Sequence, residues 1–259
     1  MAQADTAMSL FVDPPRDGVT NMAIDGCLLE QAEAGAAALR LYRWAPPTLS
    51  LGYFQRYDDP ARQAGALLKN LPVVRRCTGG GAILHADELT YSLALPIGHP
   101  LAGKNKKPEE LYTWMHARIA EAVAALGGRT APKGGRNEGN SRRGPFLCFS
   151  RHASFDLMTG PDGSATREKL VGSAQRRTKR GVLQHGSVVL ARTHPVQVSG
   201  SVSDLAGRRV RFDQMADAII RAVADAGVTL SAPRPSGVDA DRLDRQRRIH
   251  TGDQWLRRR

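Results

Sequence analysis

The chain has 259 residues, of which 41% are hydrophobic and 24% are charged, a composition that supports a buried core and excludes disordered and collagen-like chains. No run of 18 apolar residues is present, so no membrane-spanning helix is predicted. The first residues, MAQADTAMSL, lack the basic and apolar regions of a secretory signal. We therefore expect a cytoplasmic protein.

The formal net charge is strongly positive, at +12, because 37 Lys and Arg residues outnumber 25 Asp and Glu residues. Only 7 of these cations are lysines, so the excess is consistent either with a GC-rich genome or with a basic surface that attracts an acidic partner. Nucleic acid and a small acidic carrier protein both fit such a surface. An aromatic content of 5%, without interleaved aromatic and basic residues, argues against nucleic acid.

Hydrophobic periodicity and breaker residues predict an alternation of helices and strands. Helices are expected at 21–38 (with Asn21 as N-cap), 60–68, 108–126 and 212–226, and strands at 39–44, 48–52, 72–76, 82–85, 89–95, 147–158, 169–176 and 182–190. A mobile loop is expected at 129–145 and a turn at 159–168. Since no regular βαβ repeat occurs, we predict an α+β fold, a single domain with a mostly antiparallel, mixed sheet flanked by helices. Residues 1–230 would form this domain, and 231–259 a basic tail, either loosely attached or forming a short helix.

Three cysteines, Cys27, Cys77 and Cys148, lie far apart in the sequence. Their odd number and the lack of a CxxC pair argue against structural zinc and against a disulfide framework. Cys27 lies in an amphipathic segment and is expected in the core. Cys77 and Cys148 are the two candidates for a reactive thiol.

Three segments carry candidate chemistry, each with a purely structural alternative. The run Arg75 to His85, RRCTGGGAILH, contains three glycines that could lie against a ligand or form a hairpin turn. Cys148 has Arg and His neighbours that could stabilise a thiolate, or it is a small buried hydrophobic residue. Lys169, at a predicted strand start, could stabilise an oxyanion or be exposed at the end of a hairpin. No Walker or dinucleotide-binding pattern is present.

The ordered motifs NMAID, PTLSLGYFQ, RRCTGGGAILH, LTYSLALP, CF, KLVGSAQRR and LQHGSVVL resemble the lipoate/biotin protein ligase superfamily. Over residues 8 to 226 the chain is most similar to its cysteine-dependent octanoyltransferases. The resemblance implies a fold of the biotin/lipoate ligase catalytic-domain type and transfer of an octanoyl group from acyl carrier protein to a lysine. The acceptor would be a lipoyl domain, such as glycine-cleavage H protein or the E2 component of a 2-oxoacid dehydrogenase.

The same resemblance implies roles for individual residues. Cys148 matches the nucleophile that carries the acyl thioester, and Lys169 matches the acyl-site lysine. The substrate-binding positions implied are Arg76, Gly79, Gly80, Gly81, His85, Gly172, Ser173, Ala174, Gln175, His185 and Gly186. No cofactor, metal or membrane is expected, and the protein is expected to be a monomer.

Two related activities fit the same motifs. One is an ATP-dependent lipoate-protein ligase, although such ligases commonly carry an accessory domain for which 231–259 is too short. The other is an amidotransferase that moves octanoyl between lipoyl proteins. The chain also departs from the transferase pattern after the cysteine, where Ala153-Ser154-Phe155-Asp156 stands in place of the usual Pro-Ser-Tyr-Glu, and at Gly26, which replaces an acidic residue.

Overall fold

A larger mixed sheet forms the centre of the computed structural model, which describes residues 6–59, 66–102, 107–135, 145–160, 167–193 and 197–258. Its strand order is β1-β2-β6-β10-β9-β8-β7. The strands are β1 (Ser9–Val12), β2 (Ala38–Tyr42), β6 (Glu88–Pro96), β7 (Thr130–Pro132), β8 (Leu157–Thr159), β9 (Lys169–Arg177) and β10 (Gly181–Val189). Only β1 and β2 pair in parallel; the other neighbours are antiparallel.

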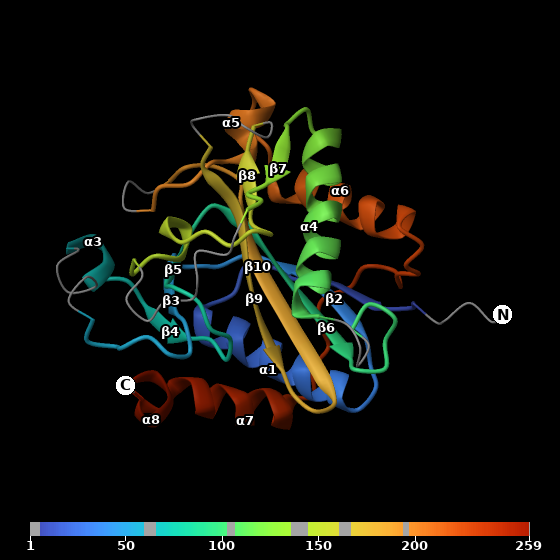
Figure 1. Ribbon diagram of the computed structural model, residues 1–259. Coiled ribbons are helices and arrows are strands. Elements are labelled where there is room, and N and C mark those ends of the chain that lie inside the picture. The colour runs from blue at the N-terminus through green and yellow to red at the C-terminus, as the bar shows by residue number, and fades with distance from the viewer. Residues whose placement is uncertain are drawn as a thin grey trace.

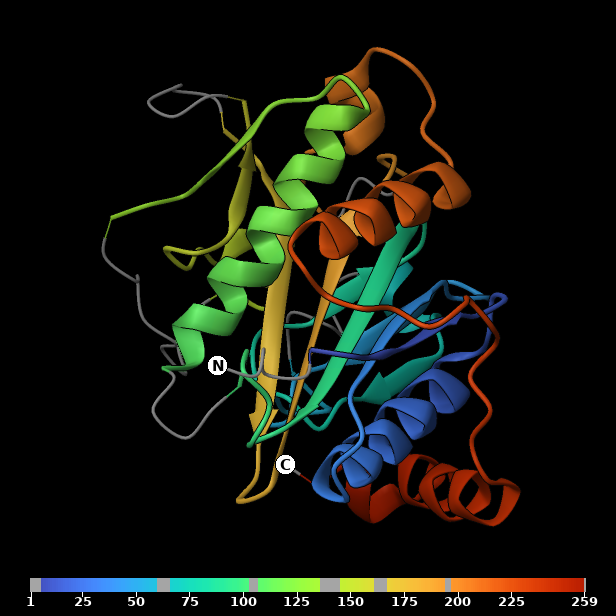
Figure 2. The same cartoon turned by 90° about the vertical axis from the view of Figure 1, so that its right-hand side faces the viewer.

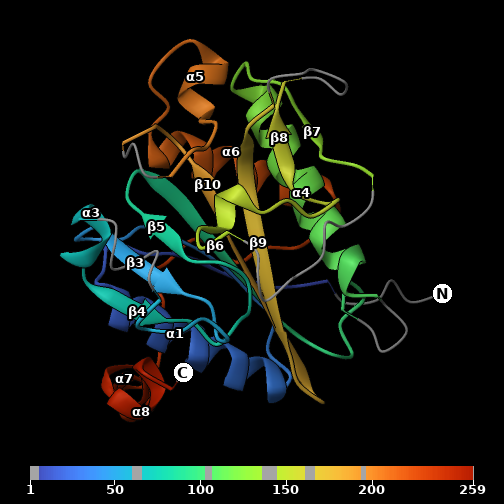
Figure 3. The same ribbon diagram turned by 60° about the vertical axis from the view of Figure 1, so that its left-hand side comes forward.

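A smaller sheet of order β4-β3-β5 lies beside helix α1 (Gly18–Glu33) and next to the larger sheet (Figure 3). Its strands are β3 (Thr48–Leu51), β4 (Val73–Arg75) and β5 (Ile83–His85). Because β4 and β5 both pair with β3 and not with each other, the glycine run between them is a crossover loop. The hairpin interpretation of Gly79–Gly81 is therefore wrong.

Helices cover the two faces of the larger sheet differently. On one face lie α4 (Pro108–Ala125) and α6 (Phe212–Asp225), which pack against each other (Figures 1 and 2). On the other lies α1, with α7 (Ala240–Thr251) alongside it. The remaining helices, α3 (Ala66–Lys69), α5 (Val202–Ala206) and α8 (Asp253–Leu256), and a 3₁₀ turn, η1 (Cys148–Ser150), are short.

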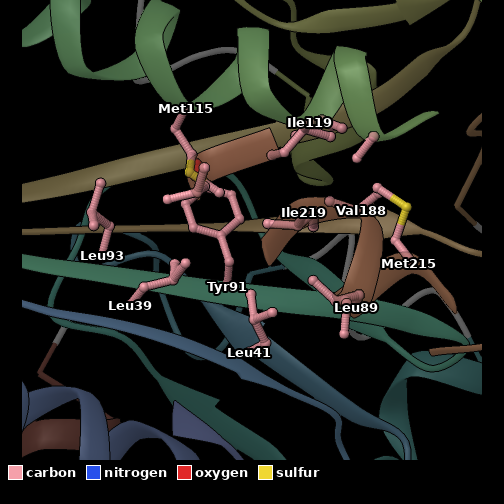
Figure 4. Close-up of a cluster of buried hydrophobic side chains, with 14 of the residues drawn as sticks. Leu39, Leu41, Leu89, Tyr91, Leu93, Met115, Ile119, Val188, Met215 and Ile219 are labelled. Carbon is pink, nitrogen blue, oxygen red and sulfur yellow. The ribbon is translucent and has the colours of Figure 1, made fainter. Parts of the chain in front are cut away.

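The period-two pattern of β6 explains why one face is apolar and the other carries polar groups. Leu89, Tyr91 and Leu93 point into the main core, among side chains of α4 and α6 (Figure 4). Thr90 and Ser92 alternate with them and are buried on the opposite face, because successive strand side chains point to opposite sides. Buried polar side chains therefore gather under the small sheet and α1.

Two element predictions need correction. Helix α1 begins at Gly18, because Asp17 caps it by accepting from the Thr20 N–H at 2.9 Å, and it ends at Glu33, before Gly35 with its φ of 102°. Asn21 lies inside the helix. The predicted strand 147–158 is mostly a turn region, because the Asp156 carboxylate accepts from the Ala153 N–H, and only β8 is extended.

The C-terminal segment is not loosely attached over its described residues. Arg75, fully buried, donates to the carbonyls of Trp255 and Leu256 and also to those of Gly52 and Gln55. This side chain therefore joins α8 to the loop after β3. The expectation of loose attachment is wrong, whereas the alternative of a short helix agrees with α7. The domain division at residue 230 stays a prediction.

Other expected elements agree with the structure within a few residues, among them the helices at 108–126 and 212–226. The predicted helix at 60–68 lies partly outside the described residues, as does the loop at 129–145, whose start forms β7. The inner part of the turn at 159–168 is also outside them.

Candidate active site

Cys148 is placed by a crossing of two chain segments. Its N–H donates to the Ala82 carbonyl at 2.7 Å, and the Ala82 N–H donates to Phe146 at 2.9 Å. A Cβ on Gly81 would lie 2.8 Å from the Cys148 nitrogen, so only glycine allows this approach. Cys148 then opens the 3₁₀ turn, with its side chain half-buried. The glycine loop thus positions the thiol directly.

Lys169 lies beside this thiol, at the start of β9. Its Nζ is 3.8 Å from Cys148 Sγ, 2.7 Å from Asp156 Oδ2 and 3.0 Å from the Arg151 carbonyl. Lys169 is 4% exposed and Asp156 is 1% exposed, so this is a buried ion pair. The alternative of an exposed hairpin lysine is wrong.

The surroundings of Lys169 favour its charged, ammonium form. Burial by itself would lower the pKa of Lys169, but the Coulomb interactions with Cys148 and Asp156 outweigh burial and raise that pKa above its ordinary value. The ammonium group is therefore retained beside the sulfur at neutral pH. An ammonium at this position stabilises a thiolate and then an oxyanion formed next to it.

Two cavities meet at Cys148. The first is an open cleft of about 290 Å³ with a mixed polar and apolar lining. Its lining residues are Gly79, Gly80, Gly81, Glu109, Tyr112, Cys148, Arg151, His152, Ala153, Phe155, Asp156, Lys169, Ser173, Ala174 and Gln175. The second is a narrow, almost wholly apolar space of about 30 Å³. Its lining residues are Met22, Tyr42, Trp44, Arg76, Gly80, Ile83, His85, Thr90, Cys148, Gly172, Ser173, Ala174, His185, Gly186 and Ser187.

All the site residues predicted from the sequence line one of these cavities or both. Gly79, Gly81, Lys169 and Gln175 line the cleft, and Arg76, His85, Gly172, His185 and Gly186 line the narrow cavity, while Cys148, Gly80, Ser173 and Ala174 line both. The structure therefore brings together residues from β4 to β10. Their individual roles in binding stay predictions.

Arg76 holds the glycine loop, Gly79–Gly81, in place through hydrogen bonds to its backbone. Fully buried, its guanidinium donates to the carbonyls of Gly79 and Gly81, both at 2.8 Å, and to Ser50 and Thr78. Burial lowers the pKa of Arg76 below its ordinary value. Five donors in a rigid fork suit such a buried set of acceptors.

Two buried histidine–carboxylate pairs support the hydroxyl groups that Arg76 contacts. His85 donates to Glu88 at 2.6 Å, and its other nitrogen is 2.7 Å from the Ser50 hydroxyl. Burial lowers the pKa of His85, against the raising effect of Glu88. His185 makes the equivalent contacts with Asp25, at 3.0 Å, and with Thr78. These histidines are held on both sides, which fixes the cavity wall.

Sequence reasoning missed Asp156 and His116. The signal for Asp156 was present, since an acidic residue stands at the end of Ala153–Asp156, but no pattern joined it to Lys169. His116, on α4, donates to the Phe155 carbonyl and lies 2.7 Å from the Ser173 hydroxyl. Burial lowers the pKa of His116, although the carbonyl contact opposes this. A single histidine on the buried face of a helix gives no sequence signal.

The other two thiols lack this environment. Burial raises the pKa of Cys27 to about 11 and that of Cys77 to about 12, so both stay protonated at neutral pH. Cys27 is fully buried, as expected for a core residue. Over the described residues, no group of His, Cys, Asp and Glu side chains could hold a metal ion. Within that same part of the chain, no helix has the length and apolarity needed to cross a bilayer.

Comparisons with known proteins agree with this geometry. The family model described as "Lipoyl protein ligase A/B catalytic domain" matches residues 17–224. Octanoyltransferase LipM of Moorella thermoacetica is 39% identical over 180 residues, covering 67% of this chain and 62% of the relative. LipM of Exiguobacterium sibiricum is 32% identical over 233 residues, covering 80% and 82%. The chain thus spans about three fifths of the length of the M. thermoacetica relative.

Solved structures agree with the predicted fold. A T. acidophilum protein, Ta0514, solved with bound lipoic acid has a TM-score of 0.74 at 18% identity, covering 98% of this chain and 100% of that one. Lipoate-protein ligase A bound with ATP has a TM-score of 0.69 at 18% identity, covering 98% of each chain. These likenesses confirm the predicted α+β fold of lipoate ligase catalytic type. Since the family model covers most of the sequence, the chain belongs to the lipoyl protein ligase A/B catalytic domain family.

Proposed function

We propose that this protein is an acyltransferase that moves an octanoyl group from acyl carrier protein, through a thioester on Cys148, to a lysine of a lipoyl domain. The observation that carries the proposal is the position of the Cys148 sulfur, 3.8 Å from the Nζ of Lys169 where the cleft and the apolar cavity meet. The relatives named Octanoyltransferase LipM support it.

In the first step, the Cys148 thiolate attacks the carbonyl carbon of the carrier thioester. The carbonyl becomes an oxyanion, which the Lys169 ammonium stabilises, and the C–S bond to the carrier then breaks. The carrier leaves as a thiolate that takes up a proton, and the acyl group remains on Cys148. One thioester replaces another of similar energy, so this step needs no activation by a nucleotide.

In the second step, the neutral amine of the acceptor lysine attacks the Cys148 thioester. An amide bond forms, the Cys148 C–S bond breaks, and the proton lost by the amine balances the returning thiolate. Amide formation from a thioester is downhill, so the cycle requires neither ATP nor another cofactor. Asp156 keeps Lys169 in place through both steps, because its carboxylate is 2.7 Å from Nζ.

Each of the two cavities would hold a different part of the substrates. The apolar cavity takes the alkyl chain, and the open cleft admits first the arm of the carrier and then the lysine of the acceptor. The family and the T. acidophilum lipoylation system among the structural neighbours support a lipoyl-domain acceptor. Glycine-cleavage H protein and the E2 component are the proposed candidates. A net charge of +12 favours encounter with acidic partners. The cytoplasmic location and the monomeric state stay predictions.

The test is a reaction of purified protein, octanoyl-carrier protein and apo lipoyl domain without ATP, read by the mass of the lipoyl domain. We expect an octanoyl adduct with wild type and with Cys77→Ala, and none with Cys148→Ala. Transfer that survives Cys148→Ala, or no transfer by folded wild type, contradicts the proposal. Lipoate-dependent AMP release that tolerates Cys148→Ala would indicate the ligase, and faster transfer from an octanoylated lipoyl protein would indicate the amidotransferase.

A further inference from the structure

We infer that Met22, on α1, closes the inner end of the apolar cavity and thereby sets the length of the acyl chain that Cys148 accepts. The inference rests on the proposed function, because it takes the cavity to be the place of the alkyl chain. It assigns a specificity-determining role to a residue of the NMAID motif for which the resemblance implied no role.

The cavity follows one row of paired residues across the larger sheet. Gly172 of β9 pairs with Ser187 of β10, Ser187 with Thr90 of β6, and Thr90 with Tyr42 of β2, and all four line the cavity. The row starts at the thiol, since a Cβ on Gly172 would lie 3.8 Å from Cys148 Sγ. It therefore has a defined direction, away from Cys148 toward β2.

The length of this row suits a medium acyl chain. Three interstrand steps of about 4.8 Å span about 14 Å. An extended octanoyl chain, with C–C bonds of about 1.5 Å, reaches about 9 Å, so its methyl end would lie near Thr90, the third strand of the row. Met22, Tyr42 and Trp44 pack together just beyond that point, with Val74.

The free space is smaller than the alkyl chain. A cavity of about 30 Å³ holds one or two water molecules, so a side chain must move when the acyl group enters. The identity of that side chain decides where the bound chain can end.

Most large side chains of the lining are held by polar contacts. Trp44 donates to Thr90 at 2.8 Å and stacks on His85 with ring centroids 3.8 Å apart. Tyr42 donates to Asp25 at 3.2 Å. Moving either ring would leave a buried polar group unsatisfied, which is costly.

Met22 and Ile83 are the large lining side chains without polar atoms that can hydrogen bond strongly. Ile83 packs with Phe149 and Val189 near Cys148, and its branched Cβ restricts its rotamers. Met22 is at the opposite end, is 3% exposed, and has an unbranched, adaptable side chain. Met22 is therefore the residue that yields, and its volume limits the chain.

The test is competition between hexanoyl-, octanoyl-, decanoyl- and dodecanoyl-carrier proteins for acylation of Cys148, read by intact-protein mass. Each further methylene buried is worth about fourfold, so Met22→Ala should raise the decanoyl-to-octanoyl ratio, which reflects two methylenes, about sixteenfold over wild type. Met22→Phe should shift the preference the other way, toward hexanoyl.

The matched control is Met115→Ala, which removes the same volume from a fully buried position of the main core, on α4, and should leave the acyl ratios unchanged. Folding of each variant is checked by thermal melting. If either folded Met22 variant gives wild-type ratios, or Met115→Ala shifts them equally, the inference is overturned while the proposed function stands. If wild type gains no acyl group of any length, the proposed function itself fails.

Discussion

The two cavities that meet at Cys148 are built in opposite ways. The cleft has about ten times the free volume of the apolar cavity, and charged side chains such as Glu109, Arg151 and Lys169 line it. The apolar cavity is closed by aromatic rings and by histidines held in buried hydrogen bonds. One sulfur atom faces both.

This contrast explains how one site can combine selectivity for the acyl chain with access for large partners. A narrow apolar cavity in which Met22 is the side chain that moves distinguishes alkyl chains by length, because each added methylene changes the packing of a dense interior. A roomy polar cleft can admit two different protein partners in turn. Changes to the cleft should therefore alter rates for all acyl chains alike, whereas changes to the apolar cavity should alter the choice among chains.

The largest effect is expected for Lys169→Met, which keeps the length of the side chain but removes its charge. The rate of Cys148 acylation should fall by about 10²- to 10³-fold, the usual loss when one oxyanion donor is removed. Rapid-quench mass spectrometry with hexanoyl and octanoyl donors measures it. Equal rate losses for both donors agree with a cleft that acts on all acyl chains alike. A loss for one donor only would show that Lys169 also selects the acyl chain.

A smaller effect is expected for Asp156→Asn. Loss of a hydrogen bond between charged groups should slow acylation roughly 10- to 100-fold. Asp156 also helps to raise the pKa of Lys169, so that pKa should fall in the variant. Lys169 then loses its proton at lower pH, and the alkaline limb of the pH–rate profile should move downward in pH. A profile that keeps its alkaline limb would show that Asp156 does not act through Lys169.

His116→Phe should have a milder effect, because it removes neutral contacts to Phe155 and Ser173 at the edge of the cleft. Losing such hydrogen bonds should slow acylation roughly 2- to 10-fold. The acylation rate of His116→Gln, which can replace part of the contact, should lie between those of His116→Phe and wild type. If His116→Phe changes the acyl-chain preference instead of the rate, the side of the cleft next to α4 takes part in selecting the acyl chain, which would contradict the prediction.

The smallest effect on activity is expected for His250→Gln, since His250 lies in the C-terminal segment and lines neither cavity. Burial lowers the pKa of His250 from 6.5 to about 4. An unfolded chain therefore binds this proton more readily, and stability is lost as pH falls from 6.5 toward 4, by about 3 kcal/mol. Denaturation at pH 7 and pH 4 should show a smaller loss in His250→Gln than in wild type. An equal loss would mean that α7 does not stay packed.

Contiguous motifs made the site predictable, whereas contacts from distant segments did not. Gly79–Gly81, Cys148 and Lys169 each stand in a short recognisable run, and the structure brings them together. Asp156 and His116 act through contacts from other elements, and no local spacing encodes such contacts. The pairing of β4 and β5 with β3, and not with each other, likewise depends on tertiary packing.

The C-terminal segment shows the same limit in the fold. Its polar composition predicted a loosely attached tail or a short helix, because few apolar residues were available to anchor it. The segment is held by Arg75, a residue of the motif that contains the glycine loop. Its guanidinium donates hydrogen bonds to the carbonyls of Trp255 and Leu256. A backbone carbonyl as the partner of a buried arginine leaves no trace in the sequence.

The thioester on Cys148 is detected most directly by the intact mass of the protein after mixing with octanoyl-carrier protein in the absence of ATP, with Cys148→Ala measured beside it. We expect one octanoyl adduct on wild type, lost on adding a lipoyl domain and absent from Cys148→Ala. A folded wild-type protein that gains no adduct, or an adduct that persists in Cys148→Ala, would contradict the placing of the thioester at the junction of the two cavities.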